Sequence, residues 1–177
     1  MMSDRSGHSE ILQRMIDRIT EKQEILKDLL RFTVQQKELL ALEEVDLDAF
    51  TVLLQERGSL MERADAVDES FMEAFLELKA TLGIDSLDQL AGGQLPPGQV
   101  QSLQKSVAGV QHLVQAIQQV DTENREVMKK YMGSLKSEIT RVQQGKKAIH
   151  GYANTRQPQP SLFMDEKEKD HRGNRKK

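Results

Sequence analysis

The chain has 177 residues, of which 37% are hydrophobic and only 4% aromatic, and this scarcity of bulky side chains favours one elongated helical domain over a globular core. Its 25 basic and 28 acidic residues nearly balance, which argues against nucleic acid or an anionic membrane surface as a partner. The absence of cysteine excludes disulfides, thiolate catalysis and cysteine-based zinc sites.

The first residues, MMSDRSGHSEIL, pass directly from polar side chains into an amphipathic pattern. No apolar signal-peptide segment precedes that pattern, and no later apolar run approaches the ~20 residues that span a bilayer. We therefore expect a cytoplasmic protein without a membrane-inserted segment.

Apolar residues recur about every 3.5 positions from Leu12 onward, which predicts a helix over residues 9–43 with one apolar stripe. We expect Ser9 to cap its amino end, because a serine oxygen can accept from the first free backbone N–H groups. Lys22 and Lys37 interrupt the stripe, so this helix is expected to pack without forming a uniform zipper.

A second apolar stripe predicts a helix over residues 46–82. The acidic stretch EEVDLD before it suits a brief turn and a new helix start, since carboxylates stabilise helix amino ends. The short turn makes the first two helices antiparallel neighbours. The second stripe is broken only around Arg57 and Gly58, and it includes the adjacent pairs Leu53/Leu54 and Leu60/Met61.

The next stretch, LGIDSLDQLAGGQLPPGQ, contains two glycine-rich spots and a proline pair. Proline cannot sit inside a helix but suits the residues that lead into one. The stretch therefore predicts a loop before the last helix, with a short helical turn at residues 86–90.

The third stripe predicts the longest helix, over residues 98–146. Polar Asp121 and Asn124 lie on this otherwise apolar stripe, and the simplest interpretation is that they fix the register between packed helices. Continuity through Asn124 and Gly133 stays open, because glycine weakens a helix interior.

The length of the third helix has a geometric consequence. It exceeds each of the others by about 10 residues, or about 15 Å. If the loop returns the chain to the starting end of the bundle, this helix runs parallel to the first, and its surplus begins after about Ser134. Apolar side chains on and near the surplus are expected to remain uncovered, which is typical of a surface for a partner helix or a dimer. They are Leu113, Val120, Val127, Leu135, Ile139 and Val142.

Residues 151–177 have a different composition, which predicts a flexible tail after a helical domain over residues 1–150. The stretch GYANTRQPQPSLFMDEK combines two prolines with aromatic side chains, and mixed charges follow it. Because apolar residues are depleted from disorder that binds nothing, we expect a short docking segment within this tail.

Signals for catalysis are weak. The chain has no glycine-rich nucleotide loop, and its ExxH (Glu168, His171) and SxxK (Ser102, Lys105) lack the companion motifs that such sites need. An acidic cluster on the second helix is interpreted as a solvated face, since nothing implies a concave apolar site around it. It consists of Asp65, Asp68, Glu69 and Glu73. We predict no enzyme, no cofactor and no metal site.

Three further features occur in one order along the chain. They are KELLALEEVDLDAFTVLLQERGSLMER at residues 37–63, TEN at residues 122–124, and the tail GYANTRQPQPSLFMDEK. In combination they resemble the FlgN-type flagellar export chaperones, whose turn between the first two helices has a similar Leu, Glu and Asp pattern.

The resemblance implies an α-helical chaperone without ATP use. Such a chaperone binds the helical terminal region of hook-associated proteins, prevents their premature assembly and delivers them to the flagellar type III export apparatus. The resemblance also implies contact between an aromatic residue of the tail and the export gate, with Tyr152 and Phe163 as the matching candidates.

The complete prediction is an all-α, elongated antiparallel three-helix bundle or coiled coil with a flexible tail. The cargo surface is expected on the residue set listed above together with Met128, which either adds adaptable apolar surface or fills a gap in the core. The alternative is a homodimeric coiled-coil structural adaptor without an export role, which would bury the same surface against a second copy.

Overall fold

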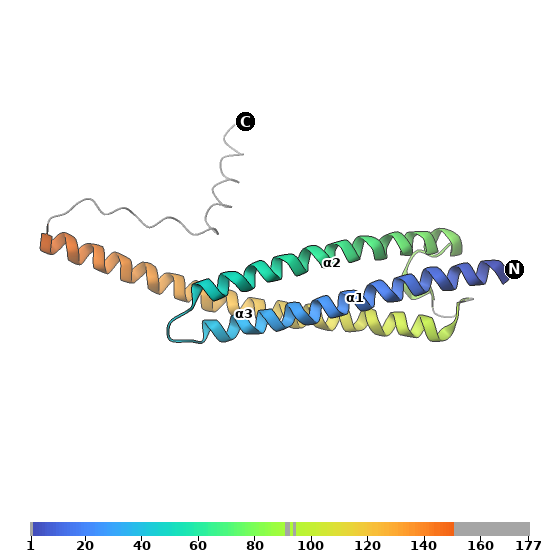
Figure 1. Ribbon diagram of the computed structural model, residues 1–177, viewed down its shortest axis with the longest axis horizontal. Coiled ribbons are helices and arrows are strands. Elements are labelled where there is room, and N and C mark those ends of the chain that lie inside the picture. Colours follow the sequence, from blue (N-terminus) through green and yellow to red (C-terminus); the bar gives the residue numbers. More distant parts are fainter. Residues whose placement is uncertain (1, 91–92, 94, 151–177) are drawn as a thin grey trace, which may run out of the picture. The chain divides into compact units, whose positions relative to one another are not determined.

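The computed structural model describes residues 2–90, 93 and 95–150. Within these residues the chain forms three long helices and one short 3-10 turn, and no strand. The elements are α1 (Met2–Leu40), α2 (Leu47–Leu82), η1 (Leu87–Leu90) and α3 (Pro97–His150) (Figure 1). The prediction of an all-α helical bundle is confirmed.

The chain divides into two compact units, the first ending at Lys130 and the second beginning at Tyr131. The first unit contains α1, α2, η1 and the part of α3 up to Lys130, and the described part of the second is the helix from Tyr131 to His150. The sequence pattern predicts one helical domain over residues 1–150. The expected tail, residues 151–177, lies outside the described residues.

The start of α1 corrects one expectation. This helix begins at Met2, so Ser9 lies inside it and is not its cap. Instead, the Ser9 hydroxyl donates to Oε1 of Gln99 on α3 over 2.9 Å, and the Gln99 amide donates back to the Ser9 carbonyl. A serine tolerated within a helix thus serves a contact between helices that no local pattern reveals.

The bounds of α2 follow from local signals. Asp46 is the N-cap, and its side chain accepts from the Ala49 N–H over 3.0 Å, as the acidic stretch predicts. At the other end, Gly83 adopts a left-handed conformation with φ +69° and donates its N–H to the Lys79 carbonyl, which ends the helix. The helix bounds agree with the predicted range of 46–82 to within one residue.

Two other predicted elements are also present. The short helical turn expected at residues 86–90 is η1. The proline pair leads into α3, whose first residue is Pro97, a position where the missing N–H of proline costs nothing. The helical pattern of α3 continues through Asn124 and Gly133, which settles the question of continuity that the sequence leaves open.

The relative directions of the helices in the first unit are defined by contacts near both ends. Ser9 meets Gln99 near the start of α1, and Thr33 meets Asn124 near its end, so α3 runs parallel to α1. α2 runs antiparallel to α1 (Figure 1). The expected course of the chain is therefore correct.

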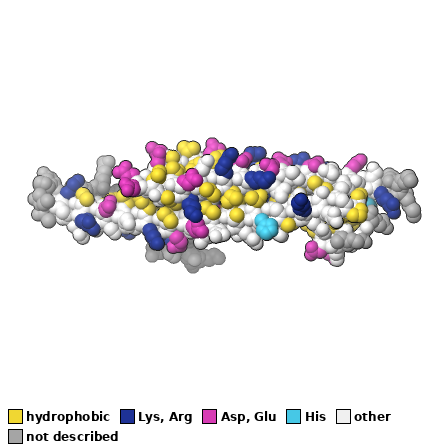
Figure 2. Space-filling view, turned by 90° about the horizontal axis from the view of Figure 1, so that it is seen from below, with side chains coloured by type: hydrophobic (Ala, Val, Ile, Leu, Met, Phe, Trp, Pro, Cys, Tyr) yellow, Lys and Arg dark blue, Asp and Glu magenta, His cyan; other side chains and the backbone are white. Residues whose placement is uncertain are grey.

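One hydrophobic core joins the elements of the first unit. Its most deeply buried apolar side chains come from all three helices, and each contributes about 1.5 to 3 kcal/mol when it leaves water. They are Leu12, Met15, Leu78 and Leu103. Apolar side chains also reach the surface, where Figure 2 shows a hydrophobic band among acidic and basic groups on one face. Among the described residues, no helix is both long and apolar enough to cross a bilayer.

Candidate functional site

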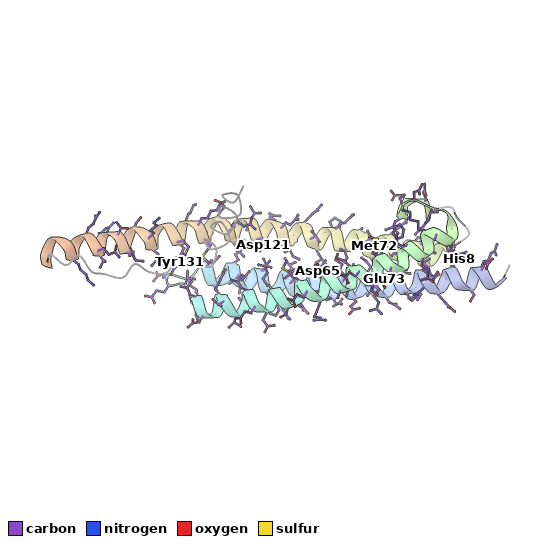
Figure 3. The ribbon with its side chains drawn as sticks, turned by 90° about the horizontal axis from the view of Figure 1, so that it is seen from above. His8, Asp65, Met72, Glu73, Asp121 and Tyr131 are labelled. Atoms are coloured by element: carbon purple, nitrogen blue, oxygen red, sulfur yellow. The ribbon has the colours of Figure 1, made fainter. Side chains whose placement is uncertain are left out.

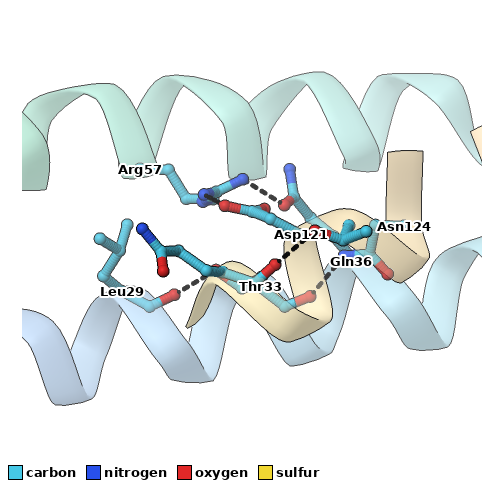
Figure 4. A network of polar contacts seen from close by, with 8 residues as sticks. Leu29, Thr33, Gln36, Arg57, Asp121 and Asn124 are labelled. Carbon is cyan, nitrogen blue, oxygen red and sulfur yellow. Dashed lines mark hydrogen bonds and ion pairs between the residues drawn. The ribbon is translucent and has the colours of Figure 1, made fainter. Parts of the chain in front are cut away.

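A polar cluster connects the three helices of the first unit (Figure 4). Arg57 of α2 donates to Oε1 of Gln36 on α1 over 2.9 Å and to Oδ2 of Asp121 on α3 over 2.7 Å. The Arg57 and Asp121 side chains are only 14% and 28% exposed, so this ion pair is largely shielded from water. The break in the α2 stripe at Arg57 is thus the point at which α2 is joined to both neighbours.

The second half of the cluster joins α3 to α1. The Asn124 amide donates to the Thr33 carbonyl over 3.0 Å, and the Thr33 hydroxyl donates to the Leu29 carbonyl over 2.6 Å. Asn124 is 6% exposed, so a shift of α3 along α1 would leave its amide buried without a partner. Asp121 and Asn124 thus make the contacts with neighbouring helices that a role in fixing the register requires.

An exposed ion pair lies beside this cluster. Lys37 donates to Oε2 of Glu123 over 2.8 Å, and both side chains are about half exposed. This hydrogen bond is the largest of the causes that hold the pKa of Glu123 below its ordinary value, and the positive charge of Lys37 is the second. Lys37, which interrupts the α1 stripe, therefore faces α3 at the solvent boundary.

The Lys37→Ala change is expected to raise the pKa of Glu123 toward its ordinary value, which an NMR titration of this carboxylate would measure. Because the folded-state pKa is lowered, the stabilisation by this pair is present above the unfolded-state pKa and is lost as the pH falls through the folded-state pKa. Solvent screening keeps the effect on stability small. An unchanged pKa of Glu123 in the variant would show that the pair does not form.

Four of the predicted cargo-surface residues lie in the first unit, and they differ in exposure. Leu113 is partly buried and packs against the core, so the bundle covers part of a side chain that was expected to stay uncovered. The physical reason is that a helix with two neighbours buries a face wider than one stripe. Val120 and Met128 are partly exposed, and Val127 is 44% exposed.

The other three predicted residues lie on one face of the helix in the second unit. Leu135, Ile139 and Val142 follow each other at spacings of four and three residues and border one shallow surface. Leu135 and Ile139 are partly exposed and Val142 is 55% exposed. The opposite face is polar, with Lys136, Ser137, Thr140, Arg141 and Gln144. This helix is therefore amphipathic in its described part.

Several other predictions stay untested by the geometry. Tyr152 and Phe163 lie outside the described residues, as do Glu168 and His171. Ser102 and Lys105 are exposed on α3. In the part of the chain that the structure describes, no three His, Cys, Asp or Glu side chains gather as a metal site would require.

One exposed surface of the first unit is missing from the sequence predictions. Apolar side chains of α2 that belong to its apparent stripe point to solvent, because only one member of each adjacent apolar pair can face the core. Leu54 and Met61 are examples, at 38% and 52% exposed. The pairs Leu53/Leu54 and Leu60/Met61 are the signal that indicates such a surface.

Comparison with known proteins gives one match. The family model described as FlgN protein matches residues 2–160, a range that includes all three helices. The search of curated proteins found no match, and neither did the search of solved structures.

Proposed function

We propose that this chain, which belongs to the FlgN family, is a flagellar export chaperone for hook-associated proteins. The family is one of chaperones in flagellum biogenesis and not of enzymes. In this proposal the protein acts in the cytoplasm, binds the helical terminal region of its cargo, prevents premature assembly and delivers the cargo to the export apparatus.

The observation that carries the proposal is the apolar face of the second unit. Leu135, Ile139 and Val142 are accessible on one face of this helix, and the opposite face is polar. An amphipathic cargo helix that packs on this face removes all three side chains from water. Each contributes about 1.5 to 3 kcal/mol at full burial, before the cost of ordering the partners.

The proposal also counts three α3 residues of the first unit as cargo-binding residues. Val127 is well exposed, and Val120 and Met128 are partly so. The flexible thioether of methionine suits a surface that accepts more than one cargo sequence. Leu113 is partly buried and packs against the core, so a cargo helix would contact only its exposed part.

The proposal also assigns export-gate docking to Tyr152 and Phe163. Deleting the residues after Gly151 is expected to leave helicity, melting temperature and cargo affinity unchanged while lowering export of the hook-associated proteins. Circular dichroism, calorimetry and an export assay would measure these quantities. A large loss of helicity on deletion would show that the segment belongs to the fold and would contradict this assignment.

The second candidate function is the homodimeric coiled-coil adaptor, which the exposed Val142 and Val127 also favour. Sedimentation separates the two functions. A monomer or weak dimer that forms a heterodimer with a hook-associated protein supports the chaperone. A permanent tight dimer that binds no such protein supports the adaptor.

A further inference from the structure

A second exposed apolar surface lies on α2, a helix that carries none of the proposed cargo residues. Four side chains follow each other at spacings of seven, eleven and four residues, which are close to whole helical turns and place them on one face. We call them the α2 stripe: Leu54, Met61, Met72 and Leu76, which are 38%, 52%, 50% and 53% exposed.

Within α2, Asp65 lies in line with the α2 stripe, four residues after Met61 and seven before Met72, and it belongs to a row of carboxylates. Its members are exposed and lie three or four residues apart, and Figure 3 labels Asp65 and Glu73 of this row with Met72 of the stripe. We call it the acidic row: Glu62, Asp65, Glu69 and Glu73. Three of them, Asp65, Glu69 and Glu73, belong to the cluster that the sequence pattern predicts to be a solvated face.

Two carboxylates of α2 outside the acidic row have cationic partners on α1. Asp68 pairs with Lys22 of α1, and Glu77 pairs with Arg14 of α1. Within the described part of the chain, no ion pair includes a residue of the acidic row. Like charges one turn apart destabilise a helix, and no ion pair among the described residues offsets the repulsion within this row.

A partner with apolar side chains would cover the exposed α2 stripe, and cations on the same partner would offset the repulsion within the acidic row. The α2 stripe spans residues 54–76, about 33 Å along a helix axis, which suits a straight helical partner of about 22 residues. Anchors in a line along one helix are the pattern that helix-to-helix docking uses. The two exposed methionines supply adaptable contacts.

We propose that the α2 stripe and the acidic row together form a docking site for a basic amphipathic helix of another protein. This site is separate from the cargo surface and does not depend on the proposed function. It would allow the chain to hold cargo through α3 while a second partner binds α2.

Charge selects this occupant over two others. A second copy of this chain would bring both acidic rows into one interface with no matching row of cations. The chain's own charged end, residues 165–177, contains no apolar side chain, so this end alone supplies charge but no apolar contact for the stripe. A helix with lysine or arginine beside an apolar face matches both features of the surface.

The test uses a synthetic helical peptide of about 22 residues with leucines on one face and lysines beside them, and fluorescence anisotropy with the full chain. The lysine peptide is expected to bind, and the same peptide with glutamates in place of lysines is not. Changing Glu62, Glu69 and Glu73 to lysine is expected to weaken binding at least about 30-fold. The double change Met61→Ser and Met72→Ser is expected to weaken it as well.

A matched control variant changes three glutamates elsewhere on the first unit to lysine, which alters the net charge by the same amount. Glu10, Glu38 and Glu56 are exposed, and changing them to lysine is expected to alter the affinity less than about 3-fold. Equal weakening by the two triple changes would overturn the proposal, because the peptide would then sense only net charge. Sedimentation that shows a dimer dissociated by the double methionine change would overturn it in favour of a second copy.

Binding of the peptide to α2 is expected not to depend on the proposed cargo residues. The peptide is expected to bind equally well when Leu135, Ile139 and Val142 are serine. If that variant loses the peptide, the peptide occupies the α3 surface and the α2 assignment is wrong.

Discussion

Changing Leu135, Ile139 and Val142 together to serine is expected to weaken the binding of a hook-associated protein by about 100-fold or more. These side chains are accessible before binding, so the change costs the free protein little stability. The complex, however, loses the burial of three apolar groups. A loss of about 1 kcal/mol from each gives about 3 kcal/mol, or somewhat more than a hundredfold in affinity. Titration calorimetry measures the affinity, and circular dichroism verifies the helicity.

The polar face of the same helix provides the control. Lys136, Thr140 and Gln144 lie opposite the apolar face, and changing all three to serine is expected to leave cargo affinity close to that of the wild type. If both triple variants bind equally well, or if both lose binding together, the cargo surface is not the face that we propose.

The Asp121→Ala change is expected to lower the free energy of unfolding by about 2 to 3 kcal/mol. It removes the counter-charge of Arg57, whose guanidinium is largely shielded from water and would keep only its hydrogen bond to Gln36. Urea denaturation followed by circular dichroism would measure the loss.

Two further variants separate this effect from a general loss of surface charge. Glu123→Ala breaks an exposed pair two positions away and is expected to change stability much less. The double change Arg57→Met and Asp121→Leu removes both charges, and it is expected to recover much of the stability lost in Asp121→Ala. Equal effects of Asp121→Ala and Glu123→Ala would show that the polar cluster does not hold the three helices together.

The helices themselves are predictable from the sequence because their signals are local. Asp46 and Gly83 delimit α2 through contacts with residues three or four positions away, and Pro97 begins α3. The apolar stripes show that these segments must pack. The start of α1 was missed because Ser9, a good cap by its residue type, is held inside the helix by Gln99, which is distant in sequence.

The surfaces are less predictable, because a stripe does not show how many neighbours a helix has. Leu113 lies off the α3 stripe and is still packed against the core. The opposite error occurs on α2, where the apolar stripe predicts Leu54 and Met61 to be core residues, but both side chains are exposed to solvent. That Arg57 pairs with Asp121 follows only from the placement of α2 beside α3. The proposed cargo face of the second unit, in contrast, is a prediction from the length of the third helix and the spacing of its apolar residues.

The measurement that tests the central claim most directly is titration calorimetry of the full chain against purified hook-filament junction proteins of the same organism. The chaperone function predicts a tight one-to-one complex with at least one of them. No heat and no complex with any junction protein, together with a stable dimer of this chain, would contradict the proposed function and identify the protein as a homodimeric adaptor.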